Sequence, residues 1–204
     1  MTYKTTRYAL LLASGLMINT TTWADDGSLY MLVGTCFSCH GYNGSSLGPT
    51  TPTIAGLDND TFVQIMTEYK DGERPSTIMG RIAKGYTGKD FQRMAEYFAK
   101  QPFVRYPQLV NTAKVKKGAI LHEKYCERCH QDNGYTDYQA SGILAGQWMP
   151  YLQLSLADFQ INARNMPRKM KIQIRKMIKG NGEESINDIV HFYGSQTRTD
   201  VDDD

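Results

Sequence analysis

Hydrophobic residues recur along this chain at the three- and four-residue intervals that place them on one face of an α-helix. The residues with this spacing include Leu29, Leu32, Val33, Ile120, Leu121 and Tyr125. No stretch shows the alternation of β-branched and polar residues that is typical of a strand. The pattern therefore predicts an all-α protein.

Further helices are predicted between and after these segments. Phe62, Ile65, Met66 and Tyr69 share a face of a helix that Asp60 would cap and Asp71-Gly72 would end. A similar stripe consists of Trp148, Leu152, Leu156 and Phe159. Two amphipathic aromatic segments, residues 91–98 and 186–193, are predicted to close the two halves of the chain. The segment 101–111 contains Pro102 and Pro107 without a helical stripe, and it is predicted to be the linker.

The first residues have the composition of a secretion signal. Lys4 and Arg7 precede an apolar stretch from Tyr8 to Ile18, and Ala24 offers a cleavage point. About 11 apolar residues are too few for a membrane anchor, since a spanning helix needs about 20. We expect residues 1–24 to be a signal peptide, with no transmembrane segment after it and a periplasmic location for the mature protein.

The chain contains an internal sequence repeat. Cys36-Phe37-Ser38-Cys39-His40 recurs 90 residues later as Cys126-Glu127-Arg128-Cys129-His130. Ile54-Ala55-Gly56 recurs at the same offset as Leu144-Ala145-Gly146. Repeats in the same order predict two tandem domains, and we place their boundary near Arg105. The expected domains are residues 25–104 and 105–199, followed by an acidic tail over residues 200–204.

The charge of the chain excludes one class of partner. Removing the signal takes away two of the 23 basic residues and none of the 21 acidic ones, which leaves 21 of each. This balance argues against a nucleic-acid partner. The apolar fraction of 41% fits a globular protein.

The repeated Cys-x-x-Cys-His pattern carries the chemistry. Two thiols at this spacing can add to the vinyl groups of a haem, and the adjacent histidine is then placed to ligate the iron. A redox-active thiol pair would need a strand-helix context that is absent, zinc sites would leave both histidines unexplained, and structural disulfides are the remaining alternative. The sequence predicts two covalently bound haem c groups, attached at Cys36, Cys39, Cys126 and Cys129 and ligated by His40 and His130.

Methionines at matching positions are the candidates for the second axial ligands. Met79 lies 39 residues after His40, and Met170 lies 40 residues after His130. Met166, one helical turn before Met170, is an alternative to it. A His/Met pair raises the reduction potential, which suits an electron relay. His122 and His191 could give bis-histidine iron, but we expect them to be surface or core residues.

The loop after His40 contains Pro49 and Pro52, and a proline carbonyl there could accept the imidazole proton. The second half has Gly134 and Gly142 without these prolines. We therefore expect the hydrogen bond to His130 to come from elsewhere.

Three segments, residues 76–86, 121–130 and 143–153, resemble the dihaem cytochrome subunit of flavocytochrome c sulfide dehydrogenase. The similarity covers about residues 28–196 and implies two class I cytochrome c domains related by a pseudo-two-fold axis. It also implies a separate flavoprotein that binds FAD and oxidises sulfide, while this chain accepts electrons without catalysis of its own. The expected acceptor is a soluble cytochrome c.

Two other functions share parts of this pattern. A free-standing dihaem shuttle to a terminal oxidase would have the same repeat and the same ligands, but no large apolar surface for a permanent partner. A dihaem peroxidase or thiosulfate-oxidising cytochrome would need an open or unusually ligated iron.

Overall fold

The computed structural model describes residues 21–137 and 141–197, and over these residues it is helical with no strand. The all-α prediction is confirmed. Most of the predicted signal peptide and the acidic tail lie outside the described residues. Within the described part of the chain, no helix is both long enough and apolar enough to cross a membrane.

The first half consists of α1 (Thr21–His40), the short 3-10 turn η1 (Tyr42–Gly44), α2 (Asn59–Asp71), α3 (Met79–Ala83) and α4 (Gly88–Phe98). Its core gathers residues from all four α-helices, including Val33, Phe62, Ala83 and Phe98. The predicted closing helix is confirmed as α4. Its first turn is fixed by Thr87 and Asp90, which form a capping box in which each side chain bonds the backbone N–H of the other.

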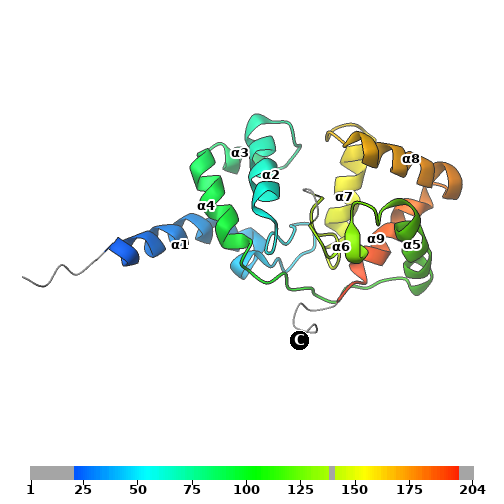
Figure 1. The fold of residues 1–204 in the computed structure, drawn as a ribbon, viewed down its shortest axis with the longest axis horizontal. Coiled ribbons are helices and arrows are strands. Elements are labelled where there is room, and N and C mark those ends of the chain that lie inside the picture. Colours follow the sequence, from blue (N-terminus) through cyan, green and yellow to red (C-terminus); the bar gives the residue numbers. More distant parts are fainter. Residues whose placement is uncertain (1–20, 138–140, 198–204) are drawn as a thin grey trace, which may run out of the picture.

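The second half consists of α5 (Thr112–Tyr125), α6 (Gln131–Gly134), α7 (Met149–Gln160), α8 (Arg168–Asn181) and α9 (Glu184–Gly194). Helices α5 and α9 pack closely because Gly118 leaves room for the backbone of Asp188, which a Cβ at that position would strike. This half has a separate core that includes Leu121, Leu152 and Val190. Figure 1 shows the two halves side by side.

Matching backbone hydrogen bonds show that the repeat extends to local geometry. The N–H of Ile54 donates to the carbonyl of Gly44 (2.8 Å), and that of Leu144 donates to Gly134 (2.9 Å). A second matched pair of hydrogen bonds joins each loop to its closing helix. The N–H of Gly56 donates to the carbonyl of Phe98 (2.8 Å), and the N–H of Gly146 donates to the carbonyl of Tyr193 (2.9 Å). The two sequence repeats therefore mark equivalent loops.

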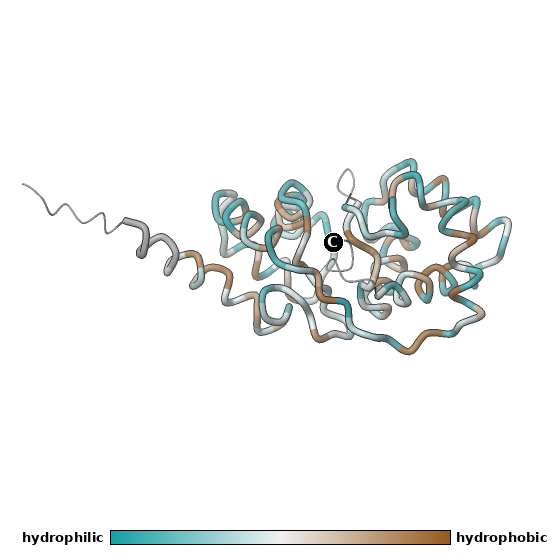
Figure 2. Tube along the Cα trace, turned by 60° about the horizontal axis from the view of Figure 1, so that its bottom comes forward, coloured by the Kyte–Doolittle hydropathy of each residue, from teal (hydrophilic) through white to brown (hydrophobic). Residues whose placement is uncertain are grey.

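Residues 102–111 contain no helix and run along one side of both halves, where Figure 2 shows hydrophobic positions in this connecting segment. Arg105 is buried there, and its guanidinium donates to the carbonyls of Ala145 and Phe103 (3.2 Å each). The connection is therefore packed against the second half, although the exact domain division stays a prediction.

Two expectations about helix starts are wrong. The N-terminal cap of α2 is Asp58, whose carboxylate accepts from the backbone N–H groups of Asp60 and Thr61, so Asp60 lies inside the first turn. Trp148 precedes α7 instead of belonging to its stripe. Its indole N–H donates to the carbonyl of Ser46 in the other half (3.0 Å), and its ring packs against Gly48.

Gln147, beside Trp148, joins the halves most directly. Its side chain is buried, accepts from the N–H of Thr53 and donates to the carbonyl of Thr53, both at 3.0 Å. These contacts span 94 residues of sequence, and they give the two loops a fixed relative position.

We predict that Gln147→Leu lowers the stability of the haem-loaded protein. The substitution leaves the buried N–H and C=O of Thr53 without partners, and an unsatisfied buried polar group costs about 1–3 kcal/mol. Guanidinium denaturation followed by circular dichroism should show an earlier unfolding midpoint. Gln153→Ala, at an exposed position on α7, is the matched control and should leave the midpoint nearly unchanged. Equal midpoints for both variants would contradict this role of Gln147.

Candidate haem-binding sites

The first Cys-x-x-Cys-His motif forms the last turn of α1. Cys36 is half-buried against the first core, Cys39 is exposed, and both thiols are free. His40 follows directly and is only 7% exposed. The helix thus presents two unpaired thiols and an imidazole within five residues, as haem attachment requires.

His40 is held in a defined tautomer. Its Nδ1 lies 2.8 Å from the carbonyl oxygen of Pro52, and because a carbonyl only accepts, Nδ1 carries the proton. Burial lowers the pKa of His40, so the imidazole is neutral at neutral pH. The lone pair of Nε2 is then free for a metal, and the hydrogen bond sets the plane of the ring. The expectation of a proline carbonyl as the acceptor agrees with this contact.

The second motif begins where α5 ends, with Cys126 as the C-terminal cap. Cys126 is half-buried and Cys129 is exposed, and both are free thiols as in the first half. The N–H of His130 donates to the carbonyl of Cys126 (3.0 Å), which keeps the motif in a helical turn. The four free thiols give no support to structural disulfides.

His130 differs from His40 in its surroundings. Burial lowers the pKa of His130 to about 4, so it is neutral at neutral pH. Its Nδ1 is buried and has no hydrogen-bond partner among the described residues. Gly142 stands at the position equivalent to Pro52, and its own N–H donates to Asp137 (2.8 Å). The backbone carbonyl at this position therefore bonds the histidine in the first half, and no equivalent bond is found in the described part of the second half.

The candidate methionines lie at helix starts. Met79 is the first residue of α3 and packs, half-buried, against the same core as Cys36. Met170 lies in the first turn of α8 and is half-buried. Met166 precedes Pro167, the N-terminal cap of α8, so Met166 and Met170 do not share a helix face. This geometry separates the two alternatives.

His122 is a core residue. One ring nitrogen contacts the hydroxyl of Tyr193 at 2.9 Å, and the other bonds the carboxylate of Glu127. With both nitrogens engaged, His122 is not available to iron. His191 accepts from the N–H of Asn111 (3.2 Å) through Nδ1, which ties α9 to the start of α5. Sequence reasoning missed Tyr193, because nothing local marks it as the partner of a residue 71 positions away.

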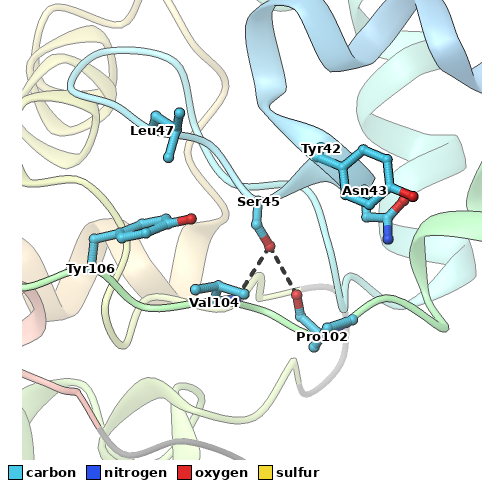
Figure 3. A pocket seen from close by; sticks show the side chains of 7 residues that line it. All are labelled: Tyr42, Asn43, Ser45, Leu47, Pro102, Val104 and Tyr106. Atoms are coloured by element: carbon cyan, nitrogen blue, oxygen red, sulfur yellow. Dashed lines mark hydrogen bonds between the residues drawn. The ribbon is translucent and has the colours of Figure 1, made fainter.

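A zinc centre finds no support in the described residues, where no group of three or more His, Cys, Asp and Glu side chains could hold a metal ion. A groove near the domain boundary lies between the loop after His40 and the linker. Figure 3 shows Ser45 fixing the connecting segment there, by donating to the carbonyl of Pro102 (2.9 Å) and accepting from the N–H of Val104 (3.2 Å). None of the predicted attachment or axial residues lines this groove.

The residues present fit two haem groups. Each half offers two free thiols and a neutral imidazole, which is buried in His40 and half-buried in His130. In the first half, Nδ1 of the imidazole is already hydrogen-bonded, which leaves Nε2 for a metal. The Nδ1 of His130, which has no partner among the described residues, leaves the second site less completely organised there.

Known proteins resemble this chain in sequence and in architecture. No family model matches the chain. The cytochrome subunit of sulfide dehydrogenase of Chlorobaculum tepidum is 43% identical over 63 residues, which are 31% of this chain and 56% of that protein, so the match spans little more than half of that relative. A cytochrome c4 of Azotobacter vinelandii is 30% identical over 145 residues, which are 63% of this chain and 69% of that protein.

A solved structure shows the same fold. The crystal structure of reduced recombinant cytochrome c4 from Pseudomonas stutzeri superposes with a TM-score of 0.70 over 83% of this chain and 97% of that chain, at 21% identity. The prediction of two class I cytochrome c domains is thereby confirmed. The sequence match to cytochrome c4, its agreement in fold and the two Cys-x-x-Cys-His sites show that this chain belongs to the cytochrome c4 family.

Proposed function

We propose that this chain is a dihaem c-type cytochrome that carries single electrons. The observation that carries the proposal is the pair of Cys-x-x-Cys-His sites, each with a neutral histidine, in a chain of the cytochrome c4 family. The residues assigned to haem attachment are Cys36, Cys39, Cys126 and Cys129, and the axial ligands are His40, Met79, His130 and Met170. The proposed domains are residues 25–104 and 105–199.

When bound, each haem supplies one-electron chemistry, and the protein sets its potential. Pro52 keeps the proton on Nδ1 of His40 (2.8 Å) and so presents Nε2 to the iron. A thioether as the opposite ligand favours the reduced iron and raises the potential. If His40 with Met79 and His130 with Met170 held each iron from both sides, no position would be left for a substrate, and the chain would relay electrons without catalysis.

A flavoprotein that binds FAD and oxidises sulfide is the proposed donor, and a soluble cytochrome c is the proposed acceptor. The support is the 43% identity with the cytochrome subunit of sulfide dehydrogenase, which exceeds the identity with cytochrome c4. We place the protein in the periplasm after removal of residues 1–24, where haem can be coupled to thiols.

A free-standing electron shuttle is the second candidate. The match to cytochrome c4 covers 63% of this chain, whereas the match to the sulfide dehydrogenase subunit covers 31%. The two candidates share the haem sites and differ only in whether a flavoprotein stays bound.

We predict that the axial methionines can be identified by substitution. Met79→Ala and Met170→Ala should each lower the midpoint potential of one haem by on the order of 100 mV, a part of the roughly 0.8 V that axial ligands span, and should abolish its sulfur-to-iron charge-transfer absorption. Spectroelectrochemical titration measures both effects. Met31→Ala, at a position on α1 that is 81% exposed, is the control. If Met166→Ala abolished the absorption and lowered the potential while Met170→Ala did not, Met166 would be the second ligand.

We also predict that sulfide reduces this protein only through its flavoprotein. When the mature chain is purified from its native periplasm, an FAD-containing chain should accompany it in a fixed ratio, and sulfide should reduce the haems within that complex. The isolated cytochrome should stay oxidised under the same sulfide concentration. A low-spin dihaem protein that is purified alone and lacks any flavoprotein donor would instead support the free-standing shuttle.

A further inference from the structure

Arg74 and Arg164 occupy equivalent positions in the two halves, 90 residues apart. Each follows its helix, α2 or α7, after a residue of positive φ, Gly72 (79°) or Asn162 (58°). The N–H of Arg74 donates to the carbonyl of Glu68 (3.2 Å), and that of Arg164 donates to Asp158 (3.1 Å). The two arginines therefore lie in loops of the same conformation.

Each guanidinium also covers an aromatic ring of its own helix. The guanidinium carbon of Arg74 lies 5.1 Å from the centre of the Tyr69 ring, and that of Arg164 lies 4.2 Å from the Phe159 ring. Stacking of this kind fixes the plane of the guanidinium and leaves its edge available for an acceptor.

The two loops meet across the boundary between the halves. Nη2 of Arg74 donates to the hydroxyl of Tyr151 in α7 (3.2 Å). Burial lowers the pKa of Arg164, and the positive charge of Arg74 lowers it further. The fold thus directs a buried cation, Arg74, and a half-buried cation, Arg164, toward the same boundary.

The described residues only partly compensate these charges. Arg74 is 6% exposed, and its Nη1 is buried without a hydrogen-bond partner in the described part of the chain. A carboxylate oxygen of Glu68 lies 3.6 Å from that nitrogen, within salt-bridge distance but too far for a hydrogen bond. Because buried charges in proteins are normally paired and hydrogen-bonded, this arrangement indicates an anion that binds between the loops.

The position of the loops indicates which anion it is. Arg74 precedes the proposed ligand Met79 by five residues, and Arg164 precedes Met170 by six. Each haem carries two propionate carboxylates, and the fork of a guanidinium matches a carboxylate in shape and charge. We propose that Arg74 and Arg164 form a clamp across the domain boundary that binds propionate carboxylates of the two haems.

This clamp rests on the proposed dihaem function and adds a consequence to it. Positive charge beside a haem stabilises the reduced state, which holds one more electron, and so raises the potential. Carboxylates shared between the two loops would also hold the haem edges of both halves toward one boundary. A free oxyanion such as phosphate has the same chemistry and is the alternative occupant.

The test measures midpoint potentials of the holoprotein. Arg74→Gln and Arg164→Gln should keep two haems per chain by the pyridine haemochrome assay and should shift at least one potential downward, with a larger shift in the double variant. Arg175→Gln removes a charge from an exposed position on α8 and should cause a smaller shift. Glu68→Gln removes the carboxylate that competes with a propionate for Arg74, and it should shift a potential upward. This variant still tests the clamp if an arginine variant does not fold.

The outcomes separate the possibilities. Gln variants that retain both haems but match Arg175→Gln, or a Glu68→Gln variant without an upward shift, would overturn the clamp while leaving the dihaem function intact. Potentials of the unsubstituted protein that depend on added phosphate, with the Arg74→Gln variant insensitive to it, would show a free oxyanion instead of propionates. A mature native chain without covalent haem would refute the proposed function itself.

Discussion

A single peptide group, between Pro52 and Thr53, links the first candidate haem site to the second half of the molecule. Its carbonyl accepts from Nδ1 of His40 (2.8 Å), and its N–H donates to the side chain of Gln147 (3.0 Å). Hydrogen bonds on both sides of one peptide polarise each other and strengthen both. The orientation of the first imidazole is therefore tied to the contact between the halves, and neither can change without cost to the other.

The repeat explains why the halves share a fold, and its imperfections explain why they differ chemically. The loops that follow the two motifs are closed by equivalent hydrogen bonds, from Ile54 to Gly44 and from Leu144 to Gly134. Within that common frame, Gly142 replaces Pro52, and the buried Nδ1 of His130 has no partner in the described residues. A weaker constraint on one imidazole of an otherwise matched pair provides a physical basis for two haems of unequal potential.

The sequence pattern predicts the features that depend on residues close together along the chain. The helices, the two motifs and the closing segments follow from hydrophobic spacing and from adjacent residues, and the structure agrees with them. The predicted cap of α2 was wrong by two residues, because both Asp58 and Asp60 suit a cap and only the path of the preceding loop selects Asp58. Trp148 continued a helical stripe in the sequence, yet its partners Ser46 and Gly48 lie about a hundred positions away. No short segment of the sequence therefore predicts these contacts of Trp148.

The arginines of the domain boundary show the limit of pattern analysis most clearly. An arginine after a helix is ordinarily solvated, and nothing around Arg74 in the sequence distinguishes it from Arg81 or Arg93. Only the fold reveals that Arg74 is buried and that its counterpart Arg164 comes from the other repeat. A repeat that duplicates an arginine and brings its two copies toward one boundary creates a positive charge that the described residues balance only in part, through Glu68. In the proposed clamp, the negative charge of the haem propionates would balance the remaining positive charge.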